Sequence, residues 1–295
     1  MKKASRNRFI TALLVCLAIA VAVPQLASAI GTTSGTTINN AASVVYSVGS
    51  VTQPLYTGPT TTFAVDTKVI FNVSKIDGAP IQVAPGDNTS STARRLRFQL
   101  QNDSNANIRF HVSAANLASA LTVTFGGTGY VDNRNTFSAN PTACFDVNAN
   151  NVCDAGEDYL VVNENILNTT IIVNGDVATN AANGDIIGVI LTATAVDGTG
   201  ATLVETAAPT ISGVDIVLAD GAGTDDTARS ATYTDRSAWQ VSAALLTVTK
   251  SAAVYSDPVN LLVNPKAIPG AVLTYTITVT NGAGGATATS ITISD

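Results

Sequence analysis

The chain has 295 residues, of which only 12% are charged, and its formal net charge at pH 7 is −6. Its basic residues form no patch beyond the first few positions, which argues against a surface that binds nucleic acid or an anionic membrane. The length is sufficient for one large domain or two smaller ones.

Residues 1–29 have the pattern of a bacterial secretory signal peptide. An apolar run from Phe9 to Ala22 precedes Ala27-Ser28-Ala29, a small-x-small cleavage site. About 14 apolar residues are too few for a spanning helix, which needs ~20. The basic residues before the run are Lys2, Lys3, Arg6 and Arg8. Cleavage would leave 11 basic and 21 acidic residues, a net charge of −10, and no membrane span.

Short segments that alternate apolar and polar residues dominate the chain after residue 62. Turn pairs such as Asp77-Gly78 and Asn174-Gly175 separate them. Many short, half-buried strands favour an antiparallel sandwich over a parallel sheet covered by helices. The alternating segments are 63–73, 96–100, 108–112, 121–125, 171–173, 186–195, 211–218 and 238–248. We expect an all-β, Ig-like sandwich over 63–245 after an N-terminal strand segment, 30–62, with one short helical segment around 114–120.

A stretch rich in Asp and Asn inside this domain predicts a calcium loop. A calcium ion takes six to eight oxygen ligands, and a loop of this kind supplies them at fixed positions with a bidentate carboxylate at position 12. Position 7 contributes only its carbonyl, and the usual glycine at position 6 is Asn151, a residue type that tolerates a left-handed backbone. The predicted ligands are Asp146, Asn148, Asn150, Val152, Asp154 and Glu157. The alternative is a solvated polar turn.

The flanks of the loop predict a structural metal site and not a switch. Pro141 and the glycines of 126–129 exclude a helix upstream, and the apolar run at 159–162 is too short for a helix downstream. Cys144 and Cys153 bracket most of the loop and remain as the two cysteines of an exported chain after Cys16 leaves with the signal. In an oxidising compartment we expect a disulfide between them.

Residues for catalysis are few, and we expect no enzyme. His111 is the single histidine and lies on a strand-like segment, which favours a structural histidine over a catalytic base. A single histidine also argues against a His-rich zinc site. Asp220, Asp225 and Asp226 lie in a Gly-rich loop that favours a solvated acidic turn over a second cation site. Trp239 follows an apolar alternation that places it in the core.

The C-terminal residues 246–295 resemble a known family. LTVTKSA at 246–252 is followed by a Pro269-Gly270 turn, the strand TYTITVTN at 274–281 and TATSITISD at 287–295. This order resembles the opening of the conserved-repeat domain of bacterial surface proteins, domain of unknown function 11. The resemblance implies an Ig-like β fold on a secreted or envelope protein and offers no catalytic residues. Such a domain continues beyond the final Asp, so we expect a short, incomplete Ig-like unit.

An incomplete unit leaves sheet edges open. Three strands cannot enclose a two-layer core, and open edges accept further strands. The preceding domain could cover the unit, or a second subunit could, with the alternating segment 36–48 as a donor strand. We therefore expect a secreted or cell-surface structural protein that contacts itself or other envelope proteins, and that calcium and a disulfide stabilise. A carbohydrate-binding or adhesive module and a secreted hydrolase with paired carboxylates are the alternatives.

Overall fold

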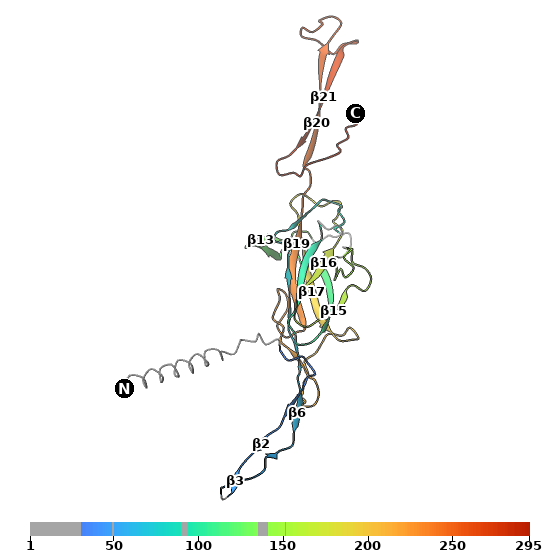
Figure 1. Ribbon diagram of the computed structural model, residues 1–295. Coiled ribbons are helices and arrows are strands. Elements are labelled where there is room, and N and C mark those ends of the chain that lie inside the picture. The colour runs from blue at the N-terminus through green and yellow to red at the C-terminus, as the bar shows by residue number, and fades with distance from the viewer. Residues whose placement is uncertain (1–30, 49, 90–93, 135–140, 151) are drawn as a thin grey trace, which may run out of the picture. The chain divides into compact units, whose positions relative to one another are not determined.

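The computed structural model describes residues 31–48, 50–89, 94–134, 141–150 and 152–295 (Figure 1). The expected signal peptide, 1–29, lies outside these residues. The described chain divides into one unit of residues 31–68 and 206–217 and a second of residues 69–205 and 218–295. Residues 63–68, which we expected at the start of the sandwich domain, fall in the first unit.

The first unit carries a two-stranded hairpin of residues 37–64, here called the N-terminal arm. Its outgoing strands pair antiparallel with its returning strands, β1 with β6, β2 with β5 and β3 with β4. Their bounds are β1 Thr37–Asn40, β2 Ser43–Val44, β3 Ser47–Val48, β4 Val51–Thr52, β5 Tyr56–Thr57 and β6 Thr61–Ala64. The segment 36–48, expected as a free strand, is thus already paired along one edge.

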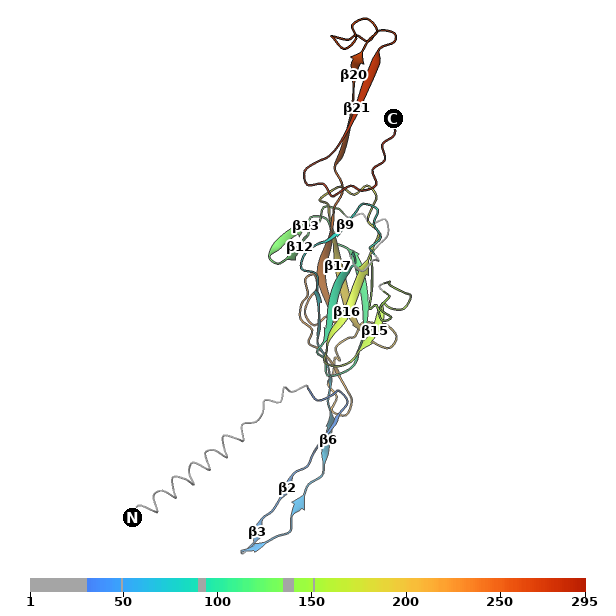
Figure 2. The ribbon, with the colours of Figure 1, turned by 45° about the horizontal axis from the view of Figure 1, so that its top comes forward.

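The second unit contains a sandwich of two sheets (Figures 1 and 2). The smaller sheet has the order β14-β16-β10-β8, and its strands are β8 Phe71–Lys75, β10 Leu96–Asn102, β14 Thr142–Cys144 and β16 Ile166–Asn174. The larger has the order β15-β11-β17-β19-β9, and its strands are β9 Ile81–Val83, β11 Ile108–Asn116, β15 Tyr159–Val162, β17 Ile186–Val196 and β19 Thr232–Val241. Every pairing in it is antiparallel except that of β9 with β19.

Alternating side chains of the two sheets meet in the core. On β10, Leu96, Phe98 and Leu100 are fully buried, as their period-2 spacing predicts. Phe71 of β8 contacts Phe110 of β11 across the sandwich, with 4.8 Å between the ring centroids. The all-β sandwich fold expected from the sequence is confirmed, and the described residues include no helix.

Short hairpins and strands flank the sandwich. β12 (Thr122–Phe125) pairs with β13 (Thr128–Val131), and Val123 and Phe125 pack with Leu117, Ile186 and Ala238 in a small second core. β7 (Thr67–Val69) pairs with β18 (Ile216–Leu218).

Three local expectations were wrong. The helix expected around 114–120 is absent because β11 continues to Asn116, where its backbone pairs with β17. The segment 211–218 contributes only the three residues of β18, and Ile211 is exposed. The segment 238–248 is the end of β19 and the start of a separate strand, β20.

The C-terminal residues form a second two-stranded hairpin. β20 (Leu246–Ser256) and β21 (Val272–Asn281) pair with each other over nearly their whole length, and no further strand is present in residues 282–295. No residue within the two strands is buried. The expected incomplete β unit is therefore a hairpin without a core of its own.

Candidate functional site

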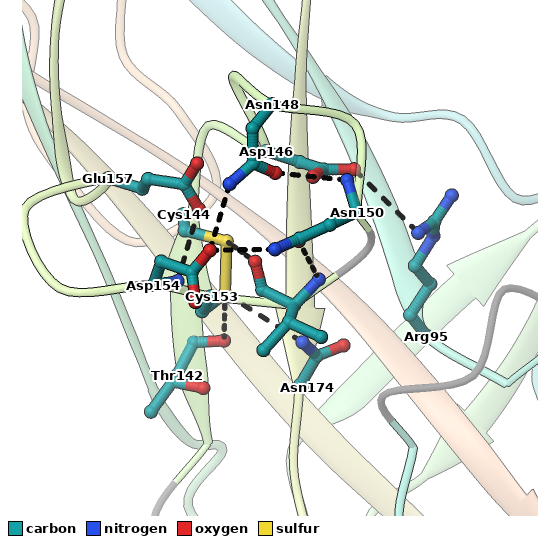
Figure 3. Close-up of a disulfide and its surroundings, with 11 residues drawn as sticks. Arg95, Thr142, Cys144, Asp146, Asn148, Asn150, Cys153, Asp154, Glu157 and Asn174 are labelled. Atoms are coloured by element: carbon teal, nitrogen blue, oxygen red, sulfur yellow. Dashed lines mark hydrogen bonds and ion pairs between the residues drawn. A yellow bond between two sulfur atoms is a disulfide. The ribbon is translucent and has the colours of Figure 1, made fainter.

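The predicted metal loop connects β14 to β15, and a disulfide closes it. Cys144, the last residue of β14, is bonded to Cys153, and their Cα atoms are 5.3 Å apart (Figure 3). The disulfide expected from the sequence is confirmed. In the chain-entropy model a ring this short contributes about 2–3 kcal/mol to stability. The backbone of Phe145 donates to the carbonyl of Glu157, which joins the two ends of the loop.

Three of the predicted ligand side chains converge at the centre of the loop. The side-chain amides of Asn148 and Asn150 both donate to Oδ2 of Asp154, at 2.8 and 2.7 Å (Figure 3). The amide oxygens face the other way and accept backbone N–H groups, Asn148 from Asn150 and Asn150 from Val152. A cation bound here would draw these amide oxygens toward Asp154 in place of the nitrogens.

The remaining predicted ligands have other partners. One oxygen of Asp146 lies 3.8 Å from Nη1 of Arg95, and Oε2 of Glu157 accepts the backbone N–H of Asp154 at 3.1 Å. Two described residues of the loop have positive φ, Ala149 at 56° and Gly156 at 89°, whereas Asn151 lies outside the described residues. In the part of the chain that the structure describes, no three His, Cys, Asp or Glu side chains form a metal-holding group.

The donor set nevertheless fits a hard cation. All the predicted side-chain ligands carry oxygen atoms, which are the ligands that calcium prefers. Arg95 competes for Asp146, so a bound cation would exchange that ion pair for coordination. The calcium site remains a prediction.

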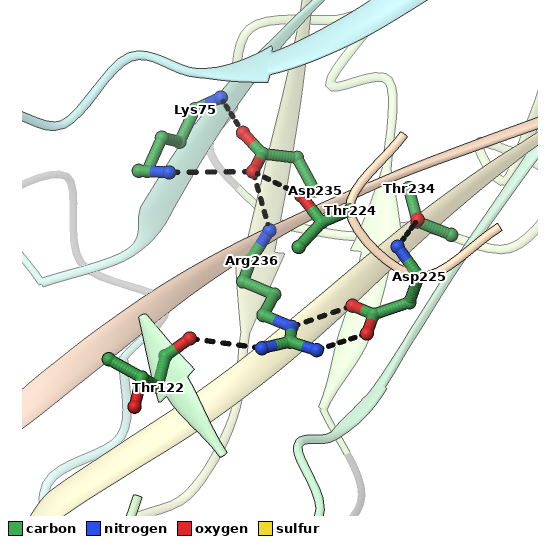
Figure 4. Close-up of polar contacts among 7 residues, drawn as sticks. All are labelled: Lys75, Thr122, Thr224, Asp225, Thr234, Asp235 and Arg236. Carbon is green, nitrogen blue, oxygen red and sulfur yellow. Dashed lines mark hydrogen bonds and ion pairs between the residues drawn. The ribbon is translucent and has the colours of Figure 1, made fainter. Parts of the chain in front are cut away.

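The acidic Gly-rich loop is mostly exposed, as the favoured solvated turn requires, but Asp220 at its start is buried. Asp220 is only 2% exposed, and its Oδ2 accepts the backbone N–H of Ser230 at 3.0 Å. Asp225 forms an ion pair with Arg236 through two hydrogen bonds (Figure 4). Asp226 accepts the backbone N–H of Gly223. Asp225 and Asp226 therefore stabilise the loop and its link to β19.

The remaining singled-out residues have structural surroundings. His111 of β11 lies beside Tyr159, with 4.5 Å between ring centroids, and its Nε2 is 3.6 Å from a carboxylate oxygen of Asp158. Trp239 is fully buried, as expected, and its indole N–H donates to the carbonyl of Arg94 at 2.6 Å.

The sequence reasoning missed the apolar surface of the N-terminal arm. Val44, Tyr46, Val48, Val51 and Tyr56 are each more than half exposed. The absence of charged residues could have revealed this surface, because no Asp, Glu, Lys or Arg occurs between residues 31 and 65. A second missed feature is the loop after β20, where Val259, Leu261, Leu262 and Val263 are exposed.

That loop is held in shape by Asp257. Its carboxylate is 3% exposed and accepts the backbone N–H groups of Val259, Asn260 and Lys266. These hydrogen bonds, the one from the Asn260 backbone first, lower the pKa of Asp257 to about 2. Leu261 has φ 58°, a left-handed conformation that costs a bulky residue free energy. The loop thus presents apolar side chains from an ordered backbone.

Comparison with known proteins adds little to this picture. No protein-family model and no curated protein matches the chain, so the resemblance to the conserved-repeat domain stays a prediction. One similar structure is described as a chaperone–tip adhesin complex of CFA/I fimbriae biogenesis, with 7% identity, 73% of this chain and 90% of that chain covered, and a TM-score of 0.26. Another is AggA, the major subunit of aggregative adherence fimbriae type I from Escherichia coli, with 10% identity, 60% and 96% covered, and a TM-score of 0.21. These TM-scores are too low to support any argument about function.

A search of the described residues for a membrane-crossing helix finds none of the required length and apolar character.

Proposed function

We propose that this protein is a secreted structural subunit of a bacterial envelope that associates with further copies of itself through uncovered β-hairpins. The observation that carries the proposal is the β20–β21 hairpin. Among the described residues its strands pair only with each other, and no residue of either strand is buried. An isolated two-stranded hairpin is marginally stable in water, and it gains stability when a further strand or a facing layer covers its apolar side.

The edges of this hairpin lack the devices that keep natural edge strands apart. Charged residues, above all Lys, and Pro usually block edge-to-edge pairing. Within the two strands Lys250 is the only charged residue, and neither strand contains Pro. Surfaces of this kind are typical of strands that pair or pack with another chain.

Self-association is tested with the full exported chain, residues 30–295. Light scattering should show a mean mass that rises with protein concentration, and electron microscopy should show assemblies. Because the contacts are apolar, raising NaCl from about 0.1 to 1 M, where the Debye length falls to roughly 3 Å, should leave association intact or strengthen it. A constant monomer mass up to the highest soluble concentration would contradict the proposal.

We further propose that calcium stabilises the 146–157 loop. Binding to the native state alone raises stability by about 2.7 kcal/mol at a hundredfold excess of calcium over Kd. Calcium should therefore raise the melting temperature, and EGTA should reverse the rise. Glu157→Gln should lose most of the gain because position 12 supplies the bidentate carboxylate. Glu205→Gln, at an exposed carboxylate paired with Arg229, is the matched control and should keep it. A melting temperature indifferent to calcium would show that the loop is a polar turn.

A further inference from the structure

We infer that association is head-to-tail, with the apolar face of the N-terminal arm of one copy packed on the apolar face of the β20–β21 hairpin of a second copy. This inference rests on the proposed function, because it names the two surfaces that meet. It replaces the donation of a single strand with the packing of one hairpin on another.

The apolar face of the arm consists of two exposed cross-strand pairs. Val44 lies directly opposite Tyr56, and Val48 lies opposite Val51, so the two side chains of each pair point to the same side of the hairpin. They are between 51% and 66% exposed. Of the residues next to them in sequence, Ser43, Ser47, Thr52 and Thr57 are polar, whereas Val45 and Leu55 are apolar and also more than half exposed.

The β20–β21 hairpin is divided into two sides more regularly. On one side, the cross-strand pairs Val248–Val279, Ala252–Tyr275 and Val254–Leu273 form an apolar face. Between Thr247 and Ala253, the other side consists of Thr and Ser with Ala253, in pairs such as Thr249–Thr278 and Ser251–Thr276. Val248 is 66% exposed and Tyr275 55%, so the apolar side is open to solvent.

The distribution of charge favours a second copy as the occupant. Residues 66–245 carry 19 acidic and 9 basic residues, so two copies repel each other wherever these parts approach. The arm has no charged residue. The one charge on the hairpin face, Lys250, lies 4.7 Å from the Tyr275 ring centroid and is paired with Asp295. Two copies can therefore meet through these two surfaces with little electrostatic cost.

The two surfaces also differ from each other, and this determines the form of the assembly. A contact between unlike patches is heterologous, so each docked copy leaves one arm and one hairpin free for the next copy. Two such sheets pack face to face at roughly 10 Å, with their side chains interdigitated. Open chains follow where the rotation between copies does not close a ring.

The test uses two variants of the exported chain with a matched control for each. Tyr56→Asp places a charge on the arm face, and Val248→Asp places one on the hairpin face. Thr57→Asp and Thr249→Asp add the same charge one residue away, on the polar side of each hairpin. All four positions are exposed, so the sandwich should unfold at the same temperature in every variant, which circular dichroism checks.

Each face variant alone should raise the concentration for half-association about a hundredfold, since it desolvates an unpaired charge, while the controls behave as wild type. An equimolar mixture of Tyr56→Asp and Val248→Asp should form a heterodimer and nothing larger, because only one intact arm and one intact hairpin meet. Sedimentation velocity measures both results.

Other outcomes separate this inference from the proposed function. If wild type associates but the mixture stays monomeric, or the face variants associate normally, the head-to-tail inference is wrong and self-association stands. If the wild type is monomeric, both the proposed self-association and the head-to-tail inference are wrong. This includes the case in which the arm covers the hairpin of its own chain. If wild type instead binds phosphatidylcholine vesicles and Val248→Asp does not, the occupant is a lipid surface and the inference is overturned.

Discussion

Replacing Asn102 with Asp should destabilise the sandwich by about 3 kcal/mol or more at pH 7, since it places an uncompensated acceptor among buried acceptors. Asn102 ends β10 and is fully buried. Its side-chain amide donates to the carbonyls of Ala106, Val162 and Asn163, at 3.0 to 3.2 Å. Val162 belongs to β15, so this one side chain links the two sheets. An aspartate has the same shape but cannot donate when ionised.

The destabilisation should depend on pH with a definite sign. Burial among carbonyl oxygens raises the pKa of the new carboxyl above its unfolded value of about 3.9. Its neutral form retains one donor, so the variant regains stability below the unfolded pKa and loses it as pH rises through the folded pKa. Urea titrations at about pH 4 and pH 8 should therefore give a larger deficit at pH 8.

The control for this experiment is Asn163→Asp, which makes the same chemical change at an exposed side chain of the adjoining turn. It should alter stability by less than about 0.5 kcal/mol at both pH values. Equal losses at Asn102 and Asn163, or a deficit at Asn102 that does not change with pH, would show that the three hydrogen bonds do not hold the sheets together.

The sandwich could be predicted from the sequence because its strands obey one physical rule. Leu96, Phe98 and Leu100 alternate with polar residues, and one face of a half-buried sheet requires this pattern. The alternation of residues does not show which strand pairs with which, or in what register. The parallel pairing of β9 with β19 and the extension of β11 to Asn116 depend on contacts between residues far apart in the chain.

The N-terminal arm shows the converse case. Alternation from Ala42 to Val48 predicted one strand, and two short strands, β2 and β3, lie there. The return strands β4, β5 and β6 are also short, and Pro54 and Pro59 lie between them. Proline has no backbone N–H to donate to a neighbouring strand, and it interrupts the alternation by which a strand is recognised in a sequence. The sequence therefore indicated the outgoing strands of the hairpin but not the returning ones, so the outgoing segment was expected to be unpaired.

The loop ligands illustrate a third limit. The spacing of Asn148, Asn150 and Asp154 predicted that their side chains converge, and they do. The spacing contained no information about Arg95. This residue directly precedes β10, which lies on the far side of β16 from β14, and its side chain lies beside Asp146. Competition from a distant residue becomes visible only when the fold brings it to the site.

Trp239→Ala should cost about 3–5 kcal/mol, the usual range for removing a buried tryptophan, which is a large part of the 5–15 kcal/mol that stabilises a typical domain. Trp239 is fully buried on β19 and pairs with Ile187 of β17 and Ile81 of β9, so the cavity would open where three strands meet. It is the only tryptophan, so its fluorescence follows unfolding of the wild type, and circular dichroism is needed for the variant.

Two further variants divide this loss into its physical parts. Trp239→Phe keeps most of the apolar volume but leaves the Arg94 carbonyl without the indole donor, so it should cost about 1–3 kcal/mol. Tyr255→Ala, at an aromatic that is 61% exposed on β20, should change stability by less than about 0.5 kcal/mol. If Trp239→Ala costs no more than Tyr255→Ala in urea, then packing at the β9–β19–β17 junction does not hold the sandwich together. An intermediate loss in Trp239→Phe would assign the remainder of the alanine effect to the cavity, because the hydrogen bond is absent from both variants.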